Sequence, residues 1–114
     1  MPTLTVTVYL NDAAGNILGF NRVSPARLRP AGVFELTLAE HLRGQHLADA
    51  ALEVIFEQLN IDVPEHDWAI AYRIIGHRSF SVGDVAVVGE TAFACAPSGW
   101  TVISADDLNA ALPH

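Results

Sequence analysis

The chain has 114 residues, 51% of them hydrophobic and 17% charged, and this apolar content is too high for a disordered or collagen-like chain. Six arginines and no lysine stand against thirteen acids, and the net charge of −7 argues against binding to nucleic acid or to an anionic membrane. We therefore predict a single domain over residues 1–114 that folds without disulfides or a structural metal.

The single cysteine and the first residues of the sequence indicate the cellular compartment of the protein. Cys95 is the single cysteine and lies in the apolar run AFACA, so it is expected to be a buried thiol in a reducing environment. The first ten residues lack the cationic segment of a signal peptide, and no apolar run approaches the ~20 residues of a membrane span. We expect a cytoplasmic protein with no membrane partner.

Residues 3–10 alternate, which predicts a strand. One face carries Leu4, Val6, Val8 and Leu10, and the other carries Thr3, Thr5, Thr7 and Tyr9. Turn-forming residues at 11–16 predict a hairpin whose second strand covers residues 17–23. Residues 24–32 contain two prolines and a glycine and predict a loop. A third strand is expected over residues 33–36.

A helix start is indicated by Thr37-Leu-Ala-Glu40, which matches a capping box, although residues 34–38 also alternate as a strand does. The main helix is predicted over residues 46–59, after a break at Gly44. Its apolar residues recur at helical spacing: Ala48, Ala51, Leu52, Ile55, Phe56 and Leu59. The opposite face carries Asp49, Glu53, Glu57 and Asn60. Either this face is simply solvated or it is an acidic docking surface.

Pro64 is a candidate first residue of a short helix with Trp68, Tyr72 and Ile75 on one face, and we favour this over an extended segment. Residues 81–88 and 91–96 predict an antiparallel hairpin, followed by a strand at 100–103 and a short helix within 104–112. The predicted fold is α+β, an antiparallel sheet of five or six strands with one main amphipathic helix packed on one face.

Motifs of common site chemistries are missing from the sequence. A P-loop needs a lysine, and neither G-x-G-x-x-G nor G-x-S-x-G occurs. His41 and His46 would point about 140° apart on one helix, and His66, His77 and His114 have no partner at metal-ligand spacing. We predict no metal, no cofactor and no enzymatic activity, although a triad assembled from distant segments would leave a small enzyme as a third possibility.

The segment from residue 73 to residue 85 holds more polar groups than a hairpin requires. The candidate binding residues are Arg73, His77, Arg78, Ser79, Ser81 and Asp84, with Trp100 as an aromatic companion. Two interpretations stay open: Asp84 caps backbone donors where the hairpin begins, or the segment is a binding surface.

Arginines also gather in the loop at residues 22–30, where Arg22, Arg27 and Arg29 are suited to a phosphate or a carboxylate. A solvated loop that balances the acidic helix is the other interpretation. If folding places these three beside Arg73 and Arg78, nucleic-acid binding becomes the alternative function.

Three strings resemble a known family: Ala71-Tyr-Arg73, Arg78-Ser-Phe-Ser-Val-Gly-Asp-Val85 and Ala92-Phe-Ala-Cys-Ala-Pro-Ser-Gly-Trp100. They are similar to small uncharacterised actinobacterial proteins from phage and plasmid contexts and, more distantly, to the YodL-like domain of mobile elements. Phe80 stands where that family usually has Leu, and Pro97 where it usually has Ser. The resemblance implies an accessory protein of a phage or mobile element and no reaction. We therefore expect a protein-binding module for a host or element-encoded protein that modulates host defence or element transfer.

Overall fold

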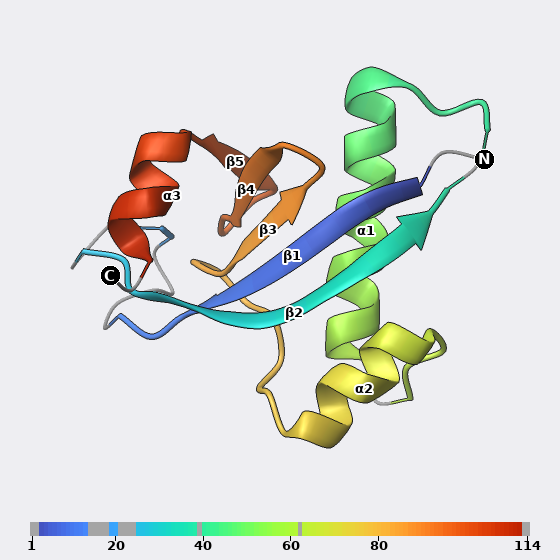
Figure 1. Ribbon diagram of the computed structural model, residues 1–114, viewed down its shortest axis with the longest axis horizontal. Helices are drawn as coiled ribbons and strands as arrows, with labels where there is room; N and C mark the ends of the chain where they lie inside the picture. Colours follow the sequence, from blue (N-terminus) through green and yellow to red (C-terminus); the bar gives the residue numbers. More distant parts are fainter. Residues whose placement is uncertain (1–2, 14–18, 21–24, 39, 62, 113–114) are drawn as a thin grey trace.

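The chain forms a five-stranded sheet with three helices. The computed structural model describes residues 3–13, 19–20, 25–38, 40–61 and 63–112. The elements are β1 (Thr3–Asn11), β2 (Leu28–Thr37), α1 (Gly44–Asn60), α2 (Asp67–Ile75), β3 (Val85–Val88), β4 (Thr91–Cys95), β5 (Trp100–Ile103) and α3 (Ala105–Ala111). All strand pairs are antiparallel, in the order β2-β1-β3-β4-β5 (Figure 1). The predicted α+β fold with a five-stranded antiparallel sheet is confirmed.

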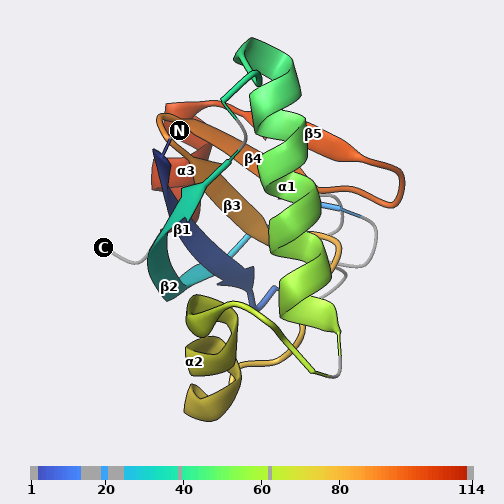
Figure 2. The ribbon, with the colours of Figure 1, turned by 90° about the vertical axis from the view of Figure 1, so that its right-hand side faces the viewer.

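Strand alternation gives the sheet two apolar faces. On one face, Val6 and Val8 of β1 pack with Leu52 and Ile55 of α1, and α2 adds to the same core. On the other face, a smaller cluster joins α3 to the far end of the sheet through Val85, Ala92, Ala94, Ile103 and Ala111. Figure 2 shows α1 lying across the sheet, with α2 near its C-terminal end. The main helix therefore covers one face, as predicted.

The predicted loop at residues 24–32 is wrong in its second half, because β2 begins at Leu28. β2 is an edge strand, so Pro30 removes no hydrogen bond that a second neighbour would need. The register shifts here: Val8 pairs with Gly32 and Tyr9 with Pro30, which leaves Ala31 as the extra residue of a bulge. The predicted strand at 33–36 is the second half of β2. Of the strand predicted at 17–23, only residues 19–20 are described, and they lie in no strand.

The predicted capping box is also wrong, because Thr37 is the last residue of β2 and α1 begins at Gly44. Leu36 and Leu38 are both buried in the core against α1, and this long-range burial outweighs the local capping preference. The helix predicted at 46–59 is confirmed within α1. Its stripe has one exception, Phe56, whose side chain is 41% exposed.

The helix favoured after Pro64 is confirmed as α2, although it begins at Asp67. Trp68 stacks on Phe34 of β2 with ring centroids 4.0 Å apart, and Tyr72 is buried. Gly76 ends the helix in the left-handed conformation at φ 98°. Ile75, predicted on the same helix face as Trp68 and Tyr72, is the last helical residue and is 70% exposed, so it does not share their burial.

In the C-terminal part, the predicted strand at 81–88 is shortened to β3 at Val85–Val88, because residues 81–84 form a turn. The predicted strands at 91–96 and 100–103 are confirmed as β4 and β5, with β4 ending at Cys95. The predicted final helix is α3, whose N-cap Ser104 accepts a hydrogen bond from the Asp107 backbone N–H at 3.1 Å.

Candidate functional site

Three of the predicted site residues, Arg78, Ser81 and Asp84, form a clamp with Asn11. The side chains of Asp84 and Asn11 are buried, whereas Arg78 and Ser81 lie at the surface. Asp84 is 0% exposed. Its carboxylate accepts two hydrogen bonds from the Arg78 guanidinium, at 2.6 and 2.7 Å. It also accepts the backbone N–H groups of Asn11 at 2.7 Å and of Ser81 at 2.8 Å. A buried carboxylate surrounded by donors in this way has its acceptor sites filled from within the protein.

The clamp joins three segments that are distant in sequence. Arg78 Nη2 also donates to the Asn11 carbonyl at 3.0 Å, and Asn11 Nδ2 donates to the Gly83 carbonyl at 3.1 Å. Asn11 Oδ1 accepts the backbone N–H of Arg27 at 3.2 Å, just before β2. The hydrogen bond to Asp84 raises the pKa of Arg78 above its ordinary value, so the guanidinium stays charged. The capping interpretation of Asp84 therefore accounts for these contacts.

The remaining predicted residues point elsewhere. Arg73 donates to the carbonyls of Leu59 and Ile61 at the end of α1, which satisfies backbone acceptors that a helix end leaves open. His77 lies against the Tyr72 ring, with centroids 4.9 Å apart. Ser79 is exposed, and its carbonyl accepts from Arg78 at 3.0 Å. The structure thus brings together only Arg78, Ser81 and Asp84 of the predicted set, with Arg73 and His77 nearby.

Several arginines gather around Tyr72. Its hydroxyl donates to the Arg78 carbonyl at 2.6 Å, and burial, followed by the charge of Asp84, raises its pKa to about 12. The positive charges of Arg78, Arg29 and Arg73 oppose that shift. Arg29 is itself paired with Asp12 at 3.0 Å. Arg27 donates to the Asp12 carbonyl at 3.4 Å, and Arg22 lies outside the described residues.

Trp100 lies away from the clamp and lines a surface cavity between α1 and β5. We call this cavity the aromatic–acidic hollow; it has a volume of about 530 Å³ and is lined by Ala50, Glu53, Val54, Phe56, Glu57 and Trp100. Phe56 meets Trp100 edge to face at a centroid distance of 6.3 Å. Both rings also contact the buried Phe80, at 6.4 and 5.8 Å. Phe80 therefore fixes the two partly exposed rings from below.

Glu53 and Glu57 form the acidic rim of this hollow. They stand one helical turn apart on α1, and both are exposed. Within the described ranges, no arginine or histidine lies within ion-pair distance of either carboxylate. The sequence places both acids on the predicted acidic face but assigns Phe56 to the core stripe. It gives no indication that β5 brings Trp100 beside them, because that contact exists only in the folded chain.

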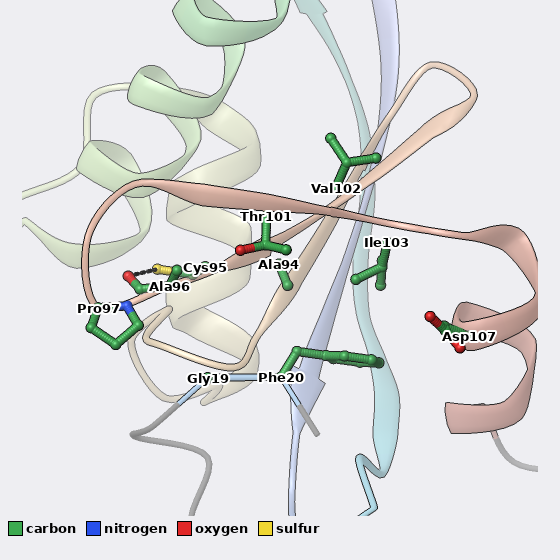
Figure 3. Close-up of a pocket in the computed structure, with 10 residues that line it drawn as sticks. All are labelled: Gly19, Phe20, Ala94, Cys95, Ala96, Pro97, Thr101, Val102, Ile103 and Asp107. Carbon is green, nitrogen blue, oxygen red and sulfur yellow. Dashed lines mark hydrogen bonds between the residues drawn. The ribbon is translucent and has the colours of Figure 1, made fainter. Parts of the chain in front are cut away.

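A second cavity, of about 360 Å³, lies on the other face of the sheet, between α3, the β4–β5 turn and residues 19–20 (Figure 3). Cys95 borders it and is buried, as predicted. Its Sγ lies 3.9 Å from the Ala96 carbonyl, and burial, then the charge of Asp84, raises the thiol pKa to about 11. At neutral pH the thiol is protonated, so it is a poor nucleophile.

Over the residues that the structure places, no three His, Cys, Asp or Glu side chains come together as metal ligands, and no helix is long and apolar enough to cross a membrane. Comparisons with protein families, curated proteins and solved structures found no match to this chain. The resemblance carried by the Arg78-Ser-Phe-Ser-Val-Gly-Asp-Val85 string accordingly stays a prediction.

Proposed function

We propose that this chain is a protein-binding module that docks a basic, apolar-anchored segment of another protein in the aromatic–acidic hollow. The observation that carries the proposal is the pairing of Phe56 and Trp100 with the exposed carboxylates of Glu53 and Glu57. The proposal includes the setting that the sequence resemblance implies: a small cytoplasmic accessory protein of a phage or mobile element, with a host or element-encoded partner.

The hollow has the two components of a protein-binding hot spot. Rigid aromatic rings supply a large contact area at a low cost in conformational entropy, and such rings dominate many interfaces. Here Phe80 holds both rings in place, so little ordering is required on binding. The carboxylates at the rim select for a partner with positive charge and increase the rate of encounter.

The partner's chemistry follows from this surface. A single apolar side chain packs on the surface formed by Phe56 and Trp100, and lysines or arginines one helical turn away meet Glu53 and Glu57. The net charge of −7 favours the approach of such a segment from solution. Binding to this surface would modulate the partner, for which host defence and element transfer are the roles that the resemblance suggests.

A designed peptide tests this surface directly. We would measure binding of a fluorescent amphipathic helix with one tryptophan flanked by lysines, and of the same helix with glutamates in place of the lysines. We expect the lysine peptide to bind and the glutamate peptide not to bind. Glu53→Gln with Glu57→Gln should weaken the lysine peptide about tenfold.

The matched control is Glu35→Gln with Glu90→Gln, which removes two exposed carboxylates outside the hollow. This control should bind the lysine peptide as the wild type does. Equal weakening by both double variants would mean that the net charge, and not the hollow, attracts the peptide, and the proposal would fail. A partner captured from the native host should likewise be lost with the first variant and kept with the second.

Nucleic-acid binding is the second candidate, favoured by the placement of Arg29, Arg73 and Arg78 around Tyr72. Against it, each of these guanidinium groups already contacts an acceptor of the protein. Labelled duplex and single-stranded DNA at low and moderate salt provide the test, because phosphate contacts weaken steeply as salt rises. Salt-sensitive binding that is lost in Arg27→Ala with Arg29→Ala would establish this candidate instead.

A further inference from the structure

We infer that the cavity on the other face of the sheet binds a small organic cation, an ammonium group carried on an apolar body. We call it the α3 cavity. It is lined by Gly19, Phe20, Ala94, Cys95, Ala96, Pro97, Thr101, Val102, Ile103 and Asp107. This site is separate from the aromatic–acidic hollow, and the inference does not depend on the proposed function.

The shape of the α3 cavity suits a small molecule. Its volume of about 360 Å³ lies within the usual range of roughly 300–1,000 Å³ for ligand sites. Figure 3 shows the Phe20 ring across the cavity from Thr101 and Ala94, with Ile103 on the side toward Asp107. An aliphatic or aromatic body would therefore lie between the ring and the apolar residues of β4 and β5.

Asp107 supplies the charge. It stands on α3 beside Ile103, at the edge of the cavity (Figure 3), and its side chain is exposed. Its backbone N–H is held by Ser104, and in the part of the chain that the structure describes no basic side chain pairs with its carboxylate. The carboxylate is thus available to accept charge-assisted hydrogen bonds from an ammonium group.

Phe20 and Asp107 also border a smaller cavity of about 80 Å³, with Pro25, Ala26 and Ala110. These two residues therefore line both cavities. A cation held here meets both the negative charge of Asp107 and the negative face of the Phe20 ring, two attractions that a neutral ligand of the same shape lacks. This combination selects a cation over an alcohol or an acid.

The probe is 2-phenylethylamine, and its neutral counterpart is 2-phenylethanol, which keeps the ring and the chain length. We would follow backbone amide resonances in ¹⁵N-labelled full-length protein during titration. The amine should shift the resonances of residues 94–97, 101–103 and 107, and the alcohol should bind at least tenfold more weakly. An equal affinity for both compounds would overturn the inference.

Asp107→Asn should weaken amine binding about tenfold, while Asp106→Asn, which removes the same charge from the preceding residue outside the cavity, should leave it unchanged. Both variants keep the Ser104 cap, which uses a backbone donor, so equal melting temperatures verify that both fold. Equal binding by the two variants would overturn the inference.

Two further measurements test whether the ammonium group comes from a free amine or from a protein, and which of the two cavities binds it. Nα-acetyl-lysine amide presents the same ammonium as a peptide side chain, and tighter binding of this compound than of the amine would assign the cavity to a protein partner instead of a free amine. Glu53→Gln with Glu57→Gln should leave amine binding intact. Loss of amine binding in that variant would place the amine in the aromatic–acidic hollow and overturn the assignment to the α3 cavity.

Discussion

The clamp and the aromatic–acidic hollow both contain carboxylates, but they use them in opposite ways. In the clamp, Asp84 is completely buried, and Arg78, Ser81 and Asn11 donate to it. In the hollow, Glu53 and Glu57 are exposed beside two aromatic rings. A carboxylate whose acceptors are filled from within fixes the path of the chain, whereas an exposed one beside apolar surface is available to a second molecule.

The largest effect should come from the clamp. Asp84→Ala leaves the backbone donors of Asn11 and Ser81 without their acceptor and removes the ion-pair partner of Arg78. We expect it to lower the free energy of unfolding by about 3–5 kcal/mol. Asp12→Ala breaks only an ion pair whose side chains are 40% and 48% exposed, and should cost less than about 1 kcal/mol. Chemical denaturation measures both. Similar losses would show that the buried and the exposed carboxylate contribute equally to stability, which would contradict the comparison.

Neighbouring residues of α1 sharpen the comparison, because Leu52 is 1% exposed and Glu53 lines the hollow. Leu52→Ala should cost about 2–5 kcal/mol through lost burial and a residual cavity. Glu53→Ala should change stability by no more than about 0.5 kcal/mol, since its carboxylate faces solvent. If Glu53→Ala is as destabilising as Leu52→Ala, the acidic face is structural and the docking proposal loses its basis.

The smallest effect concerns Tyr72 beside the clamp. Its pKa in the folded protein, about 12, lies above the ordinary value of 10, so the native state favours the protonated phenol. This contribution to stability is complete below pH 10 and is lost as the pH rises from 10 to 12. Tyr72→Phe should cost about 1 kcal/mol at pH 8, because it removes the hydrogen bond to the Arg78 carbonyl.

The pH dependence is tested by measuring the difference in unfolding free energy between the wild type and Tyr72→Phe across pH 8–12. This difference should narrow above pH 10, where the unfolded chain loses the phenol proton more readily than the folded protein does. A constant difference over that range would mean that the protonated phenol does not stabilise the fold. Thermal melting at each pH provides the measurement.

Elements with strong local periodicity could be predicted from the sequence: the alternation in β1, the apolar stripe of α1 and the turn between β3 and β4. The wrong predictions lie where contacts with residues distant in the sequence determine the local structure. β2 contains Pro30, which locally indicates a loop, yet pairing with β1 makes it an edge strand with a bulge. Residues 81–84 alternate as a strand does, but the Asp84 side chain closes a turn through Ser81 and Arg78.

The candidate site was predictable in its chemistry and not in its arrangement. One of the two interpretations of Asp84, that it caps backbone donors, agrees with the structure, and so does the placement of Glu53 and Glu57 on one face of a helix. The sequence cannot show that Arg73 contacts the end of α1, or that Trp100, predicted as a companion of the polar segment, packs against Phe56 instead. The first contact depends on how α2 packs against the end of α1, and the second on where β5 lies beside α1.

The place of β1 in the sheet has a consequence for the order of folding. β1 lies between β2 and β3, so Val6 pairs with Phe34 on one side and with Val88 on the other. During synthesis, the first partner follows β1 closely, while the second is made much later. Closing that long loop is entropically costly and slows folding. Until β3 is made, one edge of β1 stays open to pairing with other chains, which makes the growing chain vulnerable to aggregation.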